Sequence, residues 1–111
     1  MQKFYYFVRI ECETKAIQDS FVAWLRNGHY AAVIAAGALN AELVYLDPLP
    51  NADPNAPCVM ESRYEFPSRE AFARYEAGPA IALRAEGMTK FPPSSGVRMS
   101  RATGTSMLSA S

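Results

Sequence analysis

The sequence contains one histidine, His29, and its imidazole is the side chain expected to change charge near neutral pH. His29 follows an amphipathic segment that carries Trp24. It could act as a general acid or base at the mouth of a pocket. The other interpretation is structural: the imidazole caps the carbonyl groups at a helix end and packs beside Trp24. At a helix end the dipole would favour the protonated form of His29.

Two phenols, Tyr6 and Tyr64, fall on faces that the residue pattern predicts to be buried. Buried hydroxyl groups need hydrogen-bond partners, which can be each other, the backbone, water or a ligand. The phenols could therefore orient a substrate oxygen, or stabilise an enolate-like charge, opposite His29. They could equally be core residues whose tips reach a pocket edge. Ser62 is predicted on the same face, but no aspartate or second histidine is placed to complete a nucleophilic triad with it.

Aromatic residues on the two predicted helices could form the wall of a site for a flat hydrophobic ligand. Aromatic residues at helical spacing are also typical of an ordinary hydrophobic core, and the sequence leaves both interpretations open. The candidate catalytic residues are His29, Tyr6 and Tyr64, and the candidate substrate-binding residues are Trp24, Phe21, Ser62, Phe72 and Tyr75.

The elements that would position these residues follow from the pattern of apolar, capping and breaking residues. Aromatic and β-branched runs predict strands, and apolar residues three and four apart predict helices. Thr14 and Ser68 are candidate N-caps, Gly28 is a candidate helix stop, and Pro79 can begin a helix that continues beyond Gly78. The predicted strands span residues 4–12, 41–46, 58–66 and 97–102, and the predicted helices span 16–27, 29–36, 68–77 and 79–86.

This order of elements is typical of the α+β ferredoxin-like fold, βαββαβ, in which both helices cover one face of a four-stranded antiparallel sheet. A chain of 111 residues has room for one such domain, residues 1–111. Residues 47–57 hold four of the eight prolines and are predicted to form a long exposed loop. Residues 103–111 would extend the last strand or trail free, with 104–111 as a flexible tail.

Pairing of the first and third strands determines which side chains share a face. An antiparallel register that pairs Phe4 with Phe66 places the even-numbered residues of both strands on one apolar face, which the helices must cover. A slip of one residue would mix the two faces. On the other face charges then meet charges or aromatic rings, in the pairs Arg9–Glu61, Phe7–Arg63 and Tyr5–Glu65.

The same register opposes the two cysteines, Cys12 and Cys58, and would bring their Cβ atoms within disulfide range. Together with one histidine they are too few for a structural zinc site. The start of the sequence lacks the hydrophobic region and cleavage site of a signal peptide, so we expect a cytoplasmic protein. In a reducing cytoplasm both cysteines would remain thiols.

Composition limits the partners that the chain can have. Eleven basic residues balance eleven acidic ones and form no basic run, so we expect no nucleic-acid partner. No apolar run approaches the roughly 20 residues of a membrane span, so we expect no membrane partner. Half of the residues are hydrophobic, yet a domain this small buries only about two-thirds of its surface. A second copy of the chain should cover part of the rest, which predicts a homodimer.

The order and spacing of several short motifs resemble those of the dimeric α+β barrel superfamily. They are Tyr6-Phe7-Val8-Arg9, Trp24-Leu25 with His29 and Gly37, Tyr64-Glu65-Phe66, Phe72 with Tyr75, Leu83-Arg84 with Glu86, and Phe91. Within the superfamily the chain is most similar to a bacterial family of unknown function. It resembles more distantly EthD-like proteins, muconolactone isomerases, stress-responsive barrel proteins and cofactor-free antibiotic-biosynthesis monooxygenases.

The resemblance implies a homodimer with a pocket between sheet and helices that takes a small hydrophobic ligand. The histidine that haem-binding relatives carry on their second helix is absent here, so we expect no haem, and no other cofactor or metal. The leading hypothesis is a cofactor-independent isomerase, lyase or monooxygenase that acts by proton transfer on a compact hydrophobic, aromatic or lactone-like substrate. The alternative is a non-catalytic ligand-binding or stress-related barrel protein with the same pocket.

Overall fold

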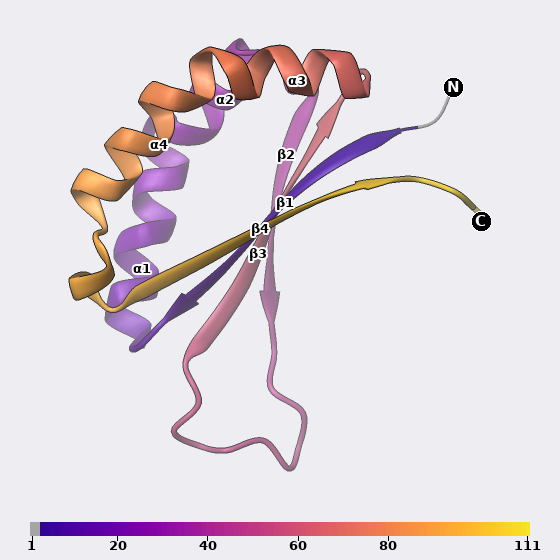
Figure 1. The fold of residues 1–111 in the computed structure, drawn as a ribbon. Helices are drawn as coiled ribbons and strands as arrows, with labels where there is room; N and C mark the ends of the chain where they lie inside the picture. The colour runs from indigo at the N-terminus through magenta and orange to yellow at the C-terminus, as the bar shows by residue number, and fades with distance from the viewer. Residues whose placement is uncertain (1–2) are drawn as a thin grey trace.

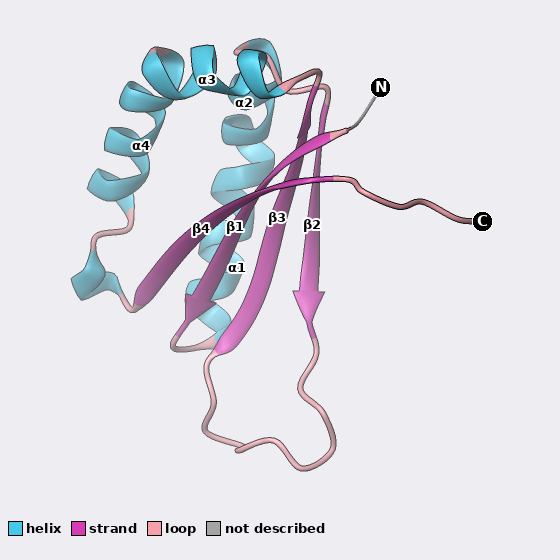
Figure 2. Cartoon of the chain, turned by 45° about the vertical axis from the view of Figure 1, so that its right-hand side comes forward, coloured by secondary structure: helices cyan, strands magenta, loops and turns pink. Residues whose placement is uncertain are grey.

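The computed structural model describes residues 3–111 and shows the predicted order of elements (Figure 1). The elements are β1 (Phe4–Cys12), α1 (Lys15–Trp24), a π-helical turn (Leu25–His29), α2 (Tyr30–Ala35), β2 (Asn40–Leu46), β3 (Cys58–Phe66), α3 (Arg69–Ala77), α4 (Pro79–Lys90), a 3-10 turn (Pro93–Ser95) and β4 (Val97–Thr105). The strands form one antiparallel sheet in the order β2-β3-β1-β4, and the helices lie on one face of it (Figure 2). The predicted ferredoxin-like fold is confirmed.

The register of β1 and β3 is the predicted one along the whole length of both strands, from Phe4 opposite Phe66 to Cys12 opposite Cys58. Tyr6 lies opposite Tyr64 on the helix-covered face, and both are buried. Because side chains alternate along a strand, this one pairing places every even-numbered side chain of the two central strands on the helix side.

Residues 103–105 extend the last strand, which is one of the two predicted outcomes, and β4 runs through Thr105 along the other edge of β1. Its register places Arg101 opposite Val8 and Met99 opposite Ile10, so both β4 side chains share the helix-covered face. The chain between β2 and β3 forms the predicted long loop, which extends beyond the sheet (Figure 1).

The helices begin where the capping residues predict. The hydroxyl oxygen of Thr14 accepts a hydrogen bond from the Ile17 amide at 3.2 Å, and Ser68 caps α3 in the same way. The predicted stop at Gly28 falls at the break between two helical segments, where Asn27 and Gly28 leave helical geometry. Gly28 has a φ of 148°, which glycine tolerates, so the chain bends in a π-helical turn and continues as α2. None of the helices in residues 3–111 is long and apolar enough to cross a membrane.

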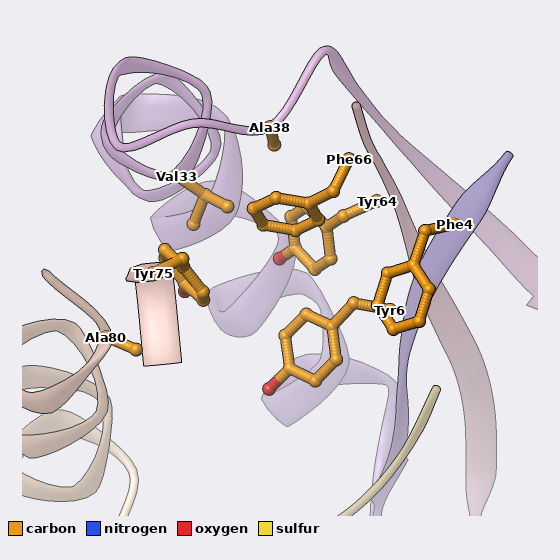
Figure 3. Close-up of a cluster of buried hydrophobic side chains, with 8 residues drawn as sticks. All are labelled: Phe4, Tyr6, Val33, Ala38, Tyr64, Phe66, Tyr75 and Ala80. Atoms are coloured by element: carbon orange, nitrogen blue, oxygen red, sulfur yellow. The ribbon is translucent and has the colours of Figure 1, made fainter. Parts of the chain in front are cut away.

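Two clusters of buried side chains fill the space between the sheet and the helices. The first packs against α2 and α3 and joins the aromatic ends of β1 and β3 (Figure 3). The second packs against α1 and includes Ile10, Phe21 and Met60. Val8 and Tyr30 contact both clusters and so mark the line where the two meet.

The opposite face of the sheet is left uncovered by the described helices (Figure 2). Tyr5 and Phe7 lie on it, half-buried, with their rings stacked at a centroid distance of 5.9 Å. The predicted neighbours Arg9 and Glu61 are opposed in the register. The ion pair at Glu61 nevertheless runs along its own strand, where the Arg63 Nε lies 2.7 Å from a Glu61 carboxylate oxygen.

The opposed cysteines generate a testable prediction. Cys12 and Cys58 are free thiols at the paired ends of β1 and β3. Directly opposed residues of an antiparallel pair have Cα atoms about 4.5–5.5 Å apart, which a disulfide can span. We expect diamide, which takes up the two hydrogens released, to join them within one chain. Thiol counts in denaturant should then fall from two to none, and the intact mass should fall by the two hydrogens.

Cys12→Ser is the control for that experiment, because its remaining thiol has no partner within the chain. Under the same treatment it should keep its thiol or form a disulfide between two chains. If the oxidised wild-type protein kept both thiols, the prediction would be wrong.

Candidate functional site

A cavity of about 70 Å³ lies between the sheet and the helix layer, where the two core clusters meet. Its walls come from β1, β3 and β4 on one side and from α1, α3 and α4 on the other. This volume is room for a few water molecules, whereas benzene fills a cavity of about 150 Å³. An aromatic ligand would therefore require the cavity to widen; Arg84 and Met99 are partly exposed side chains in its lining.

The structure brings all but one of the sequence-predicted site residues to this cavity. Those that line it are His29, Tyr6, Tyr64, Trp24, Phe21, Ser62 and Tyr75. The exception is Phe72, which packs in the core against the rings of Phe4 and Tyr6, with centroid distances of 5.4 and 5.0 Å. It lies nearly one turn before Tyr75 on α3, above the Phe4 end of β1, and so beyond the cavity.

His29 lies at the end of the π-helical turn, with its ring stacked on that of Trp24 at a centroid distance of 4.1 Å. Its Nδ1 atom is buried and has no hydrogen-bond partner among the residues that the structure describes. Burial lowers the pKa of His29, and the carboxylate of Glu86 opposes that effect only in part. The expected preference for the protonated form is therefore wrong, because His29 lies past the break at Gly28, at the start of α2, and burial disfavours its charged form.

Trp24 reaches the cavity because α4 has a glycine opposite it. A Cβ atom at Gly87 would lie 3.2 Å from the indole ring, closer than side chains normally approach. The indole Nε1 donates a hydrogen bond to Glu86 on the same helix at 3.3 Å, and Phe21 meets the ring edge-on. These contacts hold the indole as the flat surface on which the imidazole of His29 rests.

Burial keeps the phenols of Tyr64 and Tyr75 protonated at neutral pH. Burial raises the pKa of Tyr64 far above its usual value and raises that of Tyr75 to about 12. The rings of Tyr6 and Tyr64 stack at a centroid distance of 5.6 Å, and their hydroxyl groups extend from the sheet toward the helices (Figure 3). These hydroxyls can donate hydrogen bonds, whereas the neutral imidazole of His29 is the group suited to accept a proton.

Sequence reasoning missed the partner of Ser62. The Ser62 hydroxyl, which is 1% exposed, lies 2.6 Å from the hydroxyl of Tyr30 at the start of α2. Burial raises the pKa of Tyr30, and the Ser62 hydroxyl opposes this. The sequence does contain a sign of this hydrogen bond. A serine predicted on the core face needs a polar partner, and Tyr30 is adjacent in sequence to His29, a candidate for the same site. This bond ties α2 to β3 beside the cavity.

A second missed group is a chain of ionic contacts across α3, α4 and β4. One carboxylate oxygen of Glu76 accepts hydrogen bonds from Arg84 at 2.7 Å and from Arg101 at 3.0 Å. Arg101 also donates to the Tyr6 hydroxyl at 3.3 Å. The alternation of side chains along β4 predicts that Arg101 shares a face with Val97. It does not predict that Arg101 meets Glu76 and Arg84, because the three residues come from three different elements.

Comparison with known proteins identifies the fold. No family model matches the sequence, and no curated protein matches it. A dimeric ferredoxin-like protein from an uncultured marine organism superposes with a TM-score of 0.64 at 12% identity, over 99% of this chain and 100% of that one. This chain has the fold of the dimeric ferredoxin-like proteins. The ferredoxin-like fold that the resemblance implies is thereby confirmed.

Two further structures with this ferredoxin-like fold belong to groups named in the resemblance. An EthD-family protein from Bacillus halodurans has a TM-score of 0.62 at 13% identity, over 93% of this chain and 99% of that one. A monooxygenase from Streptomyces coelicolor, solved in complex with nanaomycin D, has a TM-score of 0.60 at 18% identity, over 97% and 92% of the two chains. At such identities the likeness shows the fold alone.

Metal ligands are not gathered at this site. Within residues 3–111, no three or more histidine, cysteine, aspartate and glutamate side chains lie together as they would around a metal ion.

The burial of His29 predicts how it titrates. Its pKa in the folded protein should lie below the ordinary value of 6.5, because burial disfavours the imidazolium. The unfolded chain then binds a proton more readily than the folded one. This group should therefore reduce stability as the pH falls from about 6.5 to the folded pKa, and have no effect above that range. The pH dependence of the single imidazole resonance in NMR spectra measures the pKa.

Glu86→Gln is the matched variant for this titration. It removes the carboxylate that favours the imidazolium while keeping an amide oxygen that can accept from Trp24. The pKa of His29 should fall further in this variant. A pKa of His29 above 6.5 in the wild-type protein would contradict the burial of its imidazole.

Proposed function

We propose that the protein is a cofactor-independent enzyme that moves a proton on a compact hydrophobic substrate, aromatic or lactone-like, held in the cavity. The observation that carries the proposal is the Nδ1 atom of His29. A buried imidazole nitrogen without a partner, on a residue that lines a cavity with phenol groups, is an unused proton acceptor. Its depressed pKa supports this role, because the imidazole is then neutral and able to accept a proton at neutral pH.

The chemistry assigns one role to each polar group. His29 takes a proton from an acidic C–H bond of the substrate, and the electron pair of that bond delocalises onto an adjacent carbonyl oxygen. The hydroxyls of Tyr6 and Tyr64 donate hydrogen bonds to that oxygen as negative charge develops on it. Trp24 and Phe21 contact the apolar body of the substrate.

The fate of the carbanion determines the reaction class. Return of the proton to a different carbon gives an isomerisation, and loss of a leaving group gives an elimination. Reaction with dioxygen gives a hydroperoxide, which loses water to leave a new carbonyl group, so that one oxygen atom enters the product and the other leaves as water. The likeness to a monooxygenase solved with nanaomycin D supports the third class. All three share the first proton transfer, so that step is the one to test.

The test measures hydrogen–deuterium exchange, which reports proton removal whatever happens afterwards. 2-Tetralone and the aromatic lactone 2-coumaranone have activated C–H bonds, and proton NMR in deuterium oxide follows the loss of those signals. Wild-type protein should accelerate exchange above buffer. His29→Phe keeps an aromatic ring against Trp24 but cannot accept a proton, so the acceleration should fall by about 100-fold or more.

Thermal unfolding of the variant separates catalysis from folding. His29→Phe should unfold near the wild-type temperature, and Tyr64→Phe should retain part of the acceleration because Tyr6 still donates. Binding of the two probes without any acceleration of exchange by wild-type protein would favour the non-catalytic ligand-binding alternative. Unchanged exchange in His29→Phe would remove His29 from the mechanism.

We also propose that the protein is a homodimer in which the uncovered sheet face meets a second copy. The half-buried rings of Tyr5 and Phe7 on that face, and the likeness to dimeric ferredoxin-like proteins, support this assembly. Light scattering after size exclusion should give about twice the mass of one chain at micromolar concentration. Phe7→Asp should shift the protein to the monomer, because it places a charge in the core of the interface.

Ile81→Asp is the control for the dimer. Ile81 is an exposed apolar residue on α4, on the helix side of the molecule, so the same change of chemistry there should leave the dimer intact. A stable monomer of the wild-type protein would overturn the assembly.

A further inference from the structure

The rim of the cavity carries a charge that the proposed proton transfer does not use. Among the described residues that line the cavity, Arg84 is the one whose side chain is always charged at neutral pH. Arg84 lies on α4, less than one turn before Gly87, and its side chain is 42% exposed. It therefore faces both the apolar interior and the solvent.

A second arginine stands beside it. Arg101, on β4, donates to the hydroxyl of Tyr6, which lines the cavity, and to Glu76, which also binds Arg84. Glu76 receives both arginines on one carboxylate oxygen, so one negative charge is shared between two positive ones. The group of three has a net charge of +1 and, because each guanidinium has five N–H donors, it retains donors for another acceptor.

We infer that this group, Arg84, Arg101 and Glu76, is a subsite for an anionic oxygen, and that the natural ligand is a planar hydrophobic acid. Its apolar body would enter the cavity against Trp24, and its carboxylate, or an ionised enol of the same charge, would remain at the rim on Arg84. The inference deepens the proposed function and rests on it only in taking the cavity as the ligand site. A guanidinium pair is suited to such an oxygen because charge-assisted hydrogen bonds are about twice as strong as neutral ones.

Arg101 has a further effect as a positioning residue. Because its guanidinium donates to the Tyr6 oxygen, the hydroxyl proton of Tyr6 must be directed to a different acceptor. An oxygen of the ligand beside the Tyr6 ring can be that acceptor. The subsite and the phenol would thus contact neighbouring parts of one ligand, the acid at the rim and the reacting carbonyl deeper in the cavity.

The competing interpretation is that the three charges serve only to join α3, α4 and β4. A structural network and an anion subsite respond differently to the removal of single charges. A purely structural network loses stability when either Arg84 or Glu76 is neutralised, and neither change alters the preference of the cavity for an acid. In an anion subsite the two changes have opposite effects on the binding of an acid.

The experiment compares benzoate with benzamide, which have the same size and shape but differ in charge. The sequence has one tryptophan, Trp24, and it lines the cavity, so its fluorescence reports occupancy directly. Wild-type protein should bind benzoate about tenfold more tightly than benzamide. Arg84→Gln should remove that preference, because benzoate loses a charge-assisted bond and benzamide loses only a weaker one. Glu76→Gln raises the net charge of the subsite and should strengthen benzoate binding severalfold.

Arg74→Gln is the matched control, since it removes one positive charge from an exposed position on α3 that does not line the cavity. It should leave both affinities unchanged, which separates the subsite from the overall field of the protein. Equal binding of benzoate and benzamide by wild-type protein, or no response to benzoate, would overturn the inference.

These outcomes are distinguishable from failure of the proposed function. Loss of the benzoate preference in Arg84→Gln, with no hydrogen–deuterium exchange in wild-type protein, would leave a binding protein for acids rather than an enzyme. Exchange that depends on His29, without any preference for benzoate, would leave an enzyme for neutral substrates.

Discussion

The antiparallel pairing of β1 with β3 determines where every other functional group lies. The pairing brings Tyr6 and Tyr64 side by side, with their rings stacked, on the face that the helices cover. A slip of one strand against the other by one residue would place the two phenols on opposite faces and bring charged residues of the slipped strand beneath the helices. Hydrophobic burial enforces the register, because Phe4, Ile10 and Phe66 must lie out of water along with the two tyrosines.

Removal of water then separates the polar groups of the cavity into proton acceptors and proton donors. The same cause, burial in an apolar surrounding, lowers the pKa of His29 and raises those of Tyr64 and Tyr75. The imidazole is left neutral beside phenols that keep their protons. The guanidinium of arginine keeps its charge even when it is buried. Enclosing that charge in the apolar interior would cost free energy, so the positive charge of this region lies at the rim.

The strands could be predicted because each shows an alternating pattern that needs no knowledge of distant parts of the chain. Thr14 and Ser68 are similar cases, since a cap acts on backbone groups two or three residues away. Gly28 is a third such case, because glycine tolerates the positive φ at which the helical geometry breaks. The charges joined at Glu76 come from α3, α4 and β4, and local sequence does not specify such a meeting. The direction of the His29 pKa likewise depends on how α4 packs.

The absence of a side chain at Gly87 has a consequence for how proteins of this kind could diverge. A methyl group there would press on the indole of Trp24, and the imidazole stacked on that ring would have to move with it. Replacement of this one helix residue would therefore alter the shape of the cavity and the surroundings of the histidine together, without exchange of a single polar group.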